Sequence, residues 1–418
     1  MLQFLSTQYR PSGVFLPLIT GLIFLLQFFI QNVPSGESLD LNRADSVRVS
    51  LYNLNRPDSL QLLNNSAGLI LYKGSIKDTL NSNSVNGSLY IEGGRLTFQN
   101  QQTEVRVDSL TLISDSSSTR LITDNFGYRH YSGQLRFKPD GTNRGIFIVN
   151  TVDLETYIAS VVGSEMDFDD PEALKSQAVV SRTYALWSIK KSPYNEFDLY
   201  DHESSQVYVG DIPGKPRYSE AAESTRSEVL TWSNQLILAV FSSTCGGSTV
   251  DNAAVWGGQS HPYLSSQQDA DACSPSPHFN WSYTMLESDF RQLIKQYYGF
   301  EFVDKQIEND LSGRVQKVML TGPADDTLTF TGNEFRLFIN RQEDPMAIRS
   351  TKYRWTRSNG AIIFEGKGLG HGVGLCQWGS LGLAKAGWNY KDILTFYFSG
   401  TKIVSLDNIE SNTIRLYN

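Results

Sequence analysis

Hydrophobic and polar positions alternate over the first third of the chain in short runs that are typical of β-strands. Four such runs, separated by turns rich in Asn, Ser, Gly and Asp, cover residues 46–54, 68–74, 87–99 and 103–113. Residues 128–154 continue the pattern, with a hairpin expected at Asp140 and Gly141. The first runs carry no catalytic constellation. We therefore expect residues 36–125 to form a β-rich N-terminal region that acts as a scaffold or spacer.

A helical period replaces this alternation at residue 154. Apolar residues recur at the i, i+3, i+4, i+7 spacing of one helix face, at Leu154, Tyr157, Ile158, Val161 and Val162. A second helix is predicted from Pro171, because Asp170 is a good N-cap and Glu172 lies in the first turn. Later segments predict a hairpin and glycine turn over 228–258, a helix over 286–299, strands over 312–322 and 327–340, and a helix over 390–398.

The N-terminal segment points to export. The run from Val14 to Ile30 is apolar and uncharged, with a length between that of a signal-peptide core and a spanning helix. No small-residue cleavage site follows it, which favours an uncleaved signal anchor over a cleaved signal peptide. A buried core helix is the remaining alternative. In either of the first two interpretations, residues 1–35 are a targeting segment and the rest of the chain is exported.

The net charge and the cysteines limit the possible binding partners and the possible cross-links. The net charge is −8 and no basic run is present, which argues against a nucleic-acid partner. The three cysteines leave at least one thiol free in an oxidising compartment. Cys245 and Cys273 form a disulfide in the interpretation that we favour. A zinc site that also uses His278, and two isolated thiols, are the alternatives.

Glu165 is the first candidate for chemistry. It lies between the two predicted helices, among apolar neighbours that desolvate a carboxyl group and raise its pKa, as a general acid needs. Spacing alone favours the alternative, in which Glu165 caps a helix or faces solvent. The loop with Asp198, Asp201, His202 and Glu203 lacks clean metal-ligand spacing and is interpreted as solvated charge.

The second candidate region is residues 365–390, which contains eight glycines around His371, Gln377 and Trp378. It lacks the Gly-Lys-Ser/Thr ending that is typical of a phosphate-binding loop. Bare glycine backbone beside an imidazole, an amide and an indole suits one wall of a cleft for an extended polymer, with a tight structural turn as the alternative. Gln206 and Tyr208 alternate along a predicted strand and are expected to share one face.

These blocks together resemble the SpoIID/LytB family, which comprises stage II sporulation protein D and its relatives in peptidoglycan processing. The resemblance spans about residues 130–405 and rests on "NTVDLETYIASVVGSEM", "EALKSQAVVSRTYAL", "SSQVYVG", "SSTCGGSTVDNAAVWGG" and "GKGLGHGVGLCQWGSLGLAKAGWNY" in the order of the family. It implies an α+β fold: a SpoIID-like catalytic domain over 126–418, with an inserted α+β subdomain at about 280–350, preceded by the β-rich region.

The resemblance also implies an activity. In the family, the glutamate before methionine is the catalytic acid of a lytic transglycosylase that cleaves glycan strands stripped of stem peptides, a role that carries over to Glu165. A single carboxyl group suffices if the C6 hydroxyl of the sugar replaces water and closes a 1,6-anhydro ring. The residues expected to bind the sugar are Gln206, Tyr208, His371, Gln377, Trp378 and Arg182.

The expected partners are peptidoglycan glycan strands and a cell-wall amidase that supplies denuded strands. We expect the protein to be exported to the cell envelope and to contact the membrane through its N-terminal segment. The alternative function is a non-catalytic glycan-binding enhancer of such an amidase. Some relatives bind zinc through Cys and His just before the Gln-x-Tyr strand. This chain has Asp201, His202 and Glu203 there and no Cys, so we expect no zinc in that loop. We assign no metal ligand in the candidate site and expect no cofactor.

Overall fold

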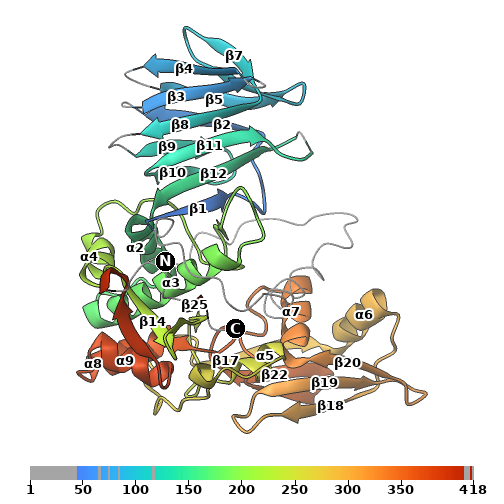
Figure 1. Cartoon of the computed structure of the whole chain (residues 1–418). Helices are drawn as coiled ribbons and strands as arrows, with labels where there is room; N and C mark the ends of the chain where they lie inside the picture. Colours follow the sequence, from blue (N-terminus) through green and yellow to red (C-terminus); the bar gives the residue numbers. More distant parts are fainter. Residues whose placement is uncertain are drawn as a thin grey trace.

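The computed structural model describes residues 45–64, 67–73, 76–82, 85–114, 118–142, 144–408 and 415–416. Figure 1 shows a β-rich region above a layer of helices, with a second α+β unit at the lower right. The predicted α+β class with a β-rich N-terminal region is confirmed. The expected targeting segment 1–35 lies outside the described residues, and within the described residues no helix is long and apolar enough to span a membrane.

Two antiparallel sheets build the β-rich region. The six-stranded sheet has the order β10 (Gly127–Tyr131), β9 (Thr119–Thr123), β2 (Ser59–Asn64), β5 (Val85–Glu92), β6 (Arg95–Gln99) and β7 (Glu104–Val107). The seven-stranded sheet has the order β13 (Leu199–Tyr200), β1 (Ser46–Leu51), β12 (Ile146–Asp153), β11 (Gln134–Pro139), β8 (Ser109–Ser114), β3 (Ala67–Lys73) and β4 (Ile76–Ser82). β13 pairs parallel to β1, whereas the other pairs of this sheet are antiparallel.

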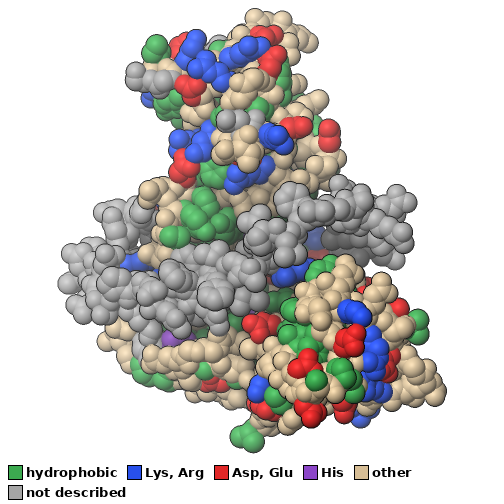
Figure 2. Space-filling view, turned by 90° about the vertical axis from the view of Figure 1, so that its right-hand side faces the viewer, with side chains coloured by type: hydrophobic (Ala, Val, Ile, Leu, Met, Phe, Trp, Pro, Cys, Tyr) green, Lys and Arg blue, Asp and Glu red, His purple; other side chains and the backbone are tan. Residues whose placement is uncertain are grey.

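The alternation that predicted these strands is visible in their burial. Val47, Val49 and Leu51 of β1 all lie in the core, and the hairpin expected near Asp140 joins β11 to β12. Strands β10, β11 and β12 follow residue 125 yet complete both sheets, so in space the β-rich region extends to Asp153. Figure 2 shows basic and acidic side chains interspersed over the upper part of the visible face.

The central layer begins with the two predicted helices. Asp153 caps α2 (Leu154–Glu165) by accepting from Thr156 N, and Asp170 caps α3 (Pro171–Lys191) by accepting from the N–H groups of Glu172 and Ala173. The remaining helices of the layer are α4 (Pro216–Ser224), α5 (Asn252–Trp256), α8 (Gln377–Lys385) and α9 (Tyr390–Tyr397), with 3-10 turns η2 (Pro262–Leu264) and η3 (Leu406–Asn408). The apolar stripe of α2 is buried as the periodicity predicts.

Short strands tie distant parts of this layer together. β14 (Glu228–Trp232) forms a sheet with β15 (Gln235–Leu236), β24 (Lys402–Ser405) and β25 (Arg415–Leu416). β16 (Phe241–Ser242) pairs in parallel with β23 (Leu375–Cys376), with Ser242 opposite Cys376. The glycine-rich segment therefore lies directly beside the segment that contains Cys245.

The inserted subdomain has a core of its own. It contains the sheet β17 (Asn280–Leu286), β22 (Ala361–Lys367), β21 (Tyr353–Ser358), the sheet β18 (Asp304–Asn309), β19 (Val315–Thr321), β20 (Thr327–Thr331), and the helices α6 (Glu287–Tyr298) and α7 (Gly332–Gln342). Its aromatic core includes Phe290, Phe335, Trp355 and Phe364. The unit runs to Lys367, beyond the expected end near 350.

The strand predicted over 327–340 is wrong in its second half. β20 stops at Thr331, and α7 begins there because Thr331 and Glu334 form a capping box. The helix start was missed because apolar residues alternate along residues 327–340 as they would in a strand. The predicted helices at 286–299 and 390–398 and the predicted strand at 312–322 are confirmed as α6, α9 and β19.

Candidate active site

Glu165 is the last residue of α2, where the helix gives way to extended backbone at Met166. Its side chain is half-buried, and its Oε1 accepts from Val207 N at 2.8 Å. Burial raises the pKa of this carboxyl group to about 7, the Val207 N–H opposes the rise, and the negative charge of Glu203 adds to it. The group is therefore able to hold and release a proton near neutral pH.

A cleft of about 930 Å³ opens beside Glu165. Its walls come from α2, α3, the loop after α3, β16, α5, α7 of the inserted subdomain and the glycine-rich segment. Besides Glu165, the lining residues that bear on ligand binding are Trp187, Tyr194, Tyr200, Glu203, Trp256, Arg341, His371 and Gln377. Its volume lies near the upper end of the range that is typical of ligand-binding clefts.

Several aromatic side chains line this cleft. Trp187 comes from α3, Tyr194 from the loop that follows, Tyr200 from β13, and Trp256 ends α5. Tyr200 donates to the hydroxyl of Tyr194 at 2.8 Å, which fixes the two rings relative to each other. Rings with one apolar face and a polar edge stack well on sugar rings. The sequence interpretation missed these residues, although five aromatic residues within 184–200 were a visible signal.

His371 lines the cleft, as the glycine-rich pattern led us to expect. Its Nδ1 accepts from Val373 N at 3.1 Å, and its ring also hydrogen-bonds the backbone of Phe241. Burial and the nearby Arg336 guanidinium lower the pKa of His371 to about 3, so the imidazole is neutral. The ring packs against Trp256 with centroids 5.1 Å apart. A hydrogen bond from His371 to a sugar would have to replace one of these internal bonds.

Gln377 also lines the cleft, at the first turn of α8, and its amide donates to Gln177 Oε1 at 3.3 Å. Trp378, the next residue, does not line the cleft. It packs edge-on against Phe168 with ring centroids 4.9 Å apart. The two side chains point apart because consecutive residues of a helix diverge by about 100°.

The glycines are explained mostly by backbone geometry. Gly370 lines the cleft, but a Cβ on Gly372 would collide with the Arg314 guanidinium and one on Gly374 with the Val240 carbonyl oxygen. Both glycines have φ near +75°, at 78° and 71°. The expectation that the glycines form a cleft wall therefore holds for Gly370 alone, whereas Gly372 and Gly374 permit the close approach of Arg314 and of the Val240 backbone.

Gln206 and Tyr208 lie in the core and do not line the cleft. Residues 205–209 form an irregular segment and not the predicted strand. Gln206 Oε1 accepts from the Tyr157 hydroxyl, and the fully buried Tyr208 donates to Asn150 Oδ1 at 2.6 Å. The sugar-binding role expected of these two side chains is corrected to a structural one, since their polar atoms face the protein interior.

Arg182 is likewise buried and structural. Its guanidinium forms an ion pair with Glu155 and donates to the carbonyl oxygens of Ala222 and Glu228. This network joins α2, α3, α4 and β14. A fully buried arginine with these partners offers no group to a sugar in the cleft, which corrects the predicted contact.

The charged loop after α3 is less solvated than its sequence predicted. Asp198 pairs with Arg48 of β1, and Asp201 Oδ2 accepts from Tyr52 N at 2.8 Å. These contacts fasten the loop to the β-rich region. His202 and Glu203 remain at the cleft.

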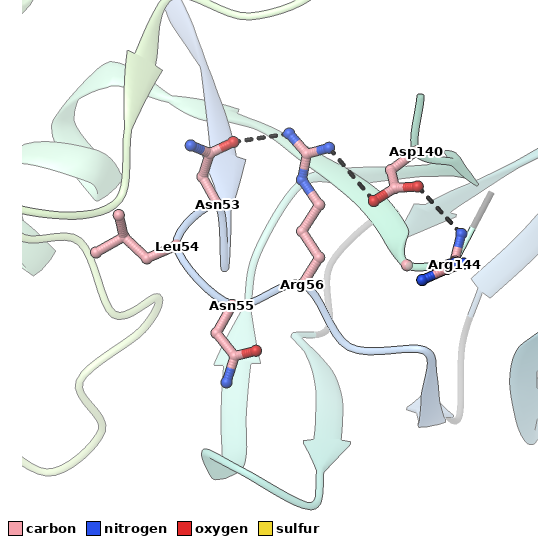
Figure 3. Close-up of a pocket in the computed structure, with 7 residues that line it drawn as sticks. Asn53, Leu54, Asn55, Arg56, Asp140 and Arg144 are labelled. Atoms are coloured by element: carbon pink, nitrogen blue, oxygen red, sulfur yellow. Dashed lines mark hydrogen bonds and ion pairs between the residues drawn. The ribbon is translucent and has the colours of Figure 1, made fainter. Parts of the chain in front are cut away.

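A smaller hollow lies at the base of the β-rich region (Figure 3). Arg56 Nη2 donates to Asn53 Oδ1 at 2.7 Å, and Arg56 lies 3.8 Å from Asp140. Asp140 also accepts from Arg144 N. Arg56 and Asp140 form their contacts with other residues of this hollow, so we interpret it as a structural feature.

The three cysteines are grouped away from the cleft lining. Cys245 Sγ and Cys273 Sγ lie 3.6 Å apart, and Cys376 Sγ accepts from Cys245 N at 3.2 Å. His278, the third ligand considered for a zinc site, instead contacts Arg349. The disulfide between Cys245 and Cys273 stays a prediction.

Known proteins resemble this chain over more than half of its length. The family model described as Stage II sporulation protein matches residues 142–232, which include Glu165 and α3. The chain is 33% identical over 287 residues to an uncharacterised protein of Brachyspira hyodysenteriae, covering 67% of this chain and 73% of that relative. The chain belongs to the SpoIID family.

Two further relatives of this SpoIID chain have descriptive names. Stage II sporulation protein D of Bacillus subtilis is 29% identical over 276 residues, covering 62% of this chain and 76% of the relative. The amidase enhancer of the same organism is 26% identical over 365 residues, covering 76% of this chain and 50% of the relative. The predicted SpoIID/LytB membership is thereby confirmed, and it gives the chain a cell-wall-related role.

Proposed function

We propose that this SpoIID chain is an exported lytic transglycosylase of the cell envelope that cleaves the MurNAc–GlcNAc bond of denuded peptidoglycan. The observation that carries the proposal is Glu165, a desolvated carboxyl group with its pKa near 7, in the lining of a cleft of about 930 Å³ that also contains aromatic side chains. A strand of sugars would lie along Trp187, Tyr200 and Trp256, and reach Glu165 with a glycosidic oxygen.

The reaction needs one proton donor that becomes a base. Glu165 would give its proton to the glycosidic oxygen as the C1–O bond breaks, which releases the leaving sugar as an alcohol. The resulting carboxylate would take the proton of the C6 hydroxyl, whose oxygen bonds to C1 and closes the 1,6-anhydro ring. Atoms and charge balance, and Glu165 ends protonated. The Val207 N–H would hold one carboxyl oxygen in place through both steps.

Mass spectrometry of digested glycan tests the proposal. The chain, incubated with glycan strands freed of stem peptides, should produce fragments with 1,6-anhydro ends. Ordinary reducing ends would instead indicate hydrolysis, with a second carboxylate such as Glu203 activating water. No cleavage at all under conditions of measurable binding would reject catalysis by this chain.

The amidase-enhancer relative supports a second candidate, a glycan-binding protein that stimulates an amidase. The aromatic cleft suits glycan binding with or without cleavage. An amidase assay with and without the chain tests this function. Stimulation that survives Glu165→Gln would favour the enhancer.

A further inference from the structure

Four metal-binding side chains converge at one buried point outside the cleft. The ligand atoms of Cys245, Asp269, Cys273 and Cys376 all lie within 4.8 Å of one another, and all four residues are buried. They come from three segments far apart in sequence: the turn after β16, the 269–273 turn and the start of α8. Neither Asp269 nor Cys376 was part of the zinc alternative weighed from the sequence.

The spacing fits a tetrahedral ion. Cys245 Sγ lies 3.6 Å from Cys273 Sγ and 3.0 Å from Asp269 Oδ2. Zinc–sulfur bonds of about 2.3 Å in a tetrahedron place two sulfurs roughly 3.8 Å apart. The pairs of ligand atoms that lie farthest apart, up to 4.8 Å, would have to approach each other by at most about 1 Å to coordinate one ion.

Backbone N–H groups surround the sulfurs. The N–H groups of Gly246 and Gly247 donate to Cys273, and those of Cys245 and Gly379 donate to Cys376 Sγ at 3.2 Å. Such donors favour the thiolate, which is the form that binds metals. Gly246 and Gly247 have φ of 73° and 94°, a conformation that turns both N–H groups toward the cluster at little cost for glycine.

The surrounding charge matches a divalent cation. Three thiolates and one carboxylate carry four negative charges, of which zinc would balance two. The fully buried Arg314 donates to Cys245 O at 2.6 Å, and Lys352 Nζ donates to Gly246 O at 3.0 Å. These two cations from the inserted subdomain balance the rest. Asp269 Oδ1, a buried carboxylate oxygen, has no hydrogen-bond partner among the described residues.

We propose that Cys245, Asp269, Cys273 and Cys376 bind one structural zinc ion. Four protein ligands leave no open position, so the site holds the fold together and takes no part in chemistry. Soft thiolates select zinc over magnesium or calcium. The Tyr397 hydroxyl lies 3.3 Å from Asp269 Oδ2 and would orient that carboxylate. A disulfide would use two of the thiols and leave Cys376 and Asp269 without a cation.

The ion would fix the geometry of the cleft. Cys376 directly precedes Gln377, and Cys245 follows Ser243, which also lines the cleft. Of the two paired strands, β23 ends at Cys376 itself, and β16 ends at Ser242, three residues before Cys245. Zinc would thus hold two walls of the cleft in register, and its role does not depend on catalysis by Glu165.

Metal analysis of the full chain, purified in mild detergent without chelators, tests the proposal. We expect about one zinc per chain by plasma mass spectrometry, and three thiols that react with an alkylating reagent only after zinc is removed. Refolding with cobalt should give the absorption bands of a tetrahedral thiolate-rich site, which needs no variant. Cys376→Ser and Asp269→Asn should lower zinc affinity 10-fold or more.

Asp271→Asn is the matched control. Asp271 is exposed in the same turn with φ of 62°, a conformation that asparagine tolerates, so its zinc content should equal that of the wild type. Substoichiometric zinc below about a tenth per chain after supply with excess zinc overturns the proposal. A Cys245–Cys273 disulfide in the zinc-supplied protein, or cobalt spectra of an octahedral oxygen site, overturns it as well.

Discussion

The backbone N–H of Val207 donates to Glu165 Oε1 at 2.8 Å and joins the end of α2 to the segment before α4. The same carboxyl group is desolvated, and its pKa rises to about 7 in spite of this hydrogen bond. One fixed oxygen and one protonatable group at the edge of the cleft are what a general acid needs.

Glu165→Gln should reduce glycan cleavage at least 100-fold while glycan binding persists. The amide can still accept from Val207 N but has no acidic proton, and general acid catalysis contributes 10²–10⁴-fold. Release of anhydro ends measures the effect. Activity above about a tenth of wild type would remove Glu165 from the acid role.

Glu203→Gln is the companion variant. Because the charge of Glu203 raises the pKa of Glu165, its removal should shift the alkaline limb of the pH–rate profile to lower pH and leave cleavage intact. Loss of all cleavage in this variant would point to Glu203 as a second catalytic carboxylate.

The stability of the fold should also depend on the ionisation of Glu165. Its pKa is about 7 in the folded chain against an ordinary value of 4.5, so the folded state binds the proton more tightly. This contribution is present below about pH 4.5 and is lost as pH rises through 7. Glu165→Gln should therefore melt near wild type at pH 5 and above it at pH 8. The exposed Glu220→Gln should show no such difference, and equal melting of Glu165→Gln and wild type at both pH values would contradict the desolvation of Glu165.

Trp256→Ala should weaken glycan binding by about tenfold. The variant loses an aromatic face of the cleft and the packing of His371, and an aromatic contact of this kind contributes on the order of 1–1.5 kcal/mol. Trp388, which is 37% exposed and outside the cleft lining, provides the control, and Trp388→Ala should bind normally. Equal affinities of the two variants in a pull-down titration with denuded glycan would mean that sugars do not contact Trp256.

Tyr208→Phe should affect folding and leave binding unchanged. Its hydroxyl donates to buried Asn150, and removal of a buried partner costs about 1–3 kcal/mol. Denaturant unfolding should report this loss, whereas Tyr128→Phe, at a position 66% exposed, should be neutral. Weaker glycan binding by folded Tyr208→Phe would restore the residue to the site.

Local sequence signals predicted the elements well. The apolar stripe of α2, the Asp170 cap of α3 and the alternation of β1 each depend on a few neighbouring residues, and the structure contains all three. There are two exceptions. The capping box of α7 at Thr331 lies inside a run that also alternates like a strand, and the strand predicted around Gln206 and Tyr208 is an irregular segment.

Site residues were harder to predict, because spacing does not reveal which way a side chain points. Arg182 lies in a strongly matching helix, yet its partner is Glu155, 27 positions earlier in the chain. Tyr208 faces Asn150 for the same reason, since only the folded sheet brings them together. The aromatic cleft joins α3, α5 and the inserted subdomain, and no local pattern links those segments.

Substitutions in the glycine-rich segment should lower the stability of the fold without changing its affinity for glycan. Gly374 has φ of 71°, and a methyl group there would collide with the Val240 carbonyl oxygen. Gly387 has φ of 93° with open space around its Cβ position, so Gly387→Ala measures the conformational cost alone, about 1–2 kcal/mol. Gly374→Ala should lose about 1–3 kcal/mol more, the usual cost of overpacking.

Gly372→Ala should behave like Gly374→Ala, because its methyl group would meet the buried Arg314 guanidinium. Denaturant unfolding of the three variants gives the free energies, and titration with denuded glycan at 25 °C gives the affinity of the folded fraction. We expect that affinity to equal wild type in all three, since neither Gly372 nor Gly374 lines the cleft. If Gly374→Ala is as stable as Gly387→Ala but binds glycan more weakly, then its methyl group faces the ligand and the glycine row forms the cleft wall after all.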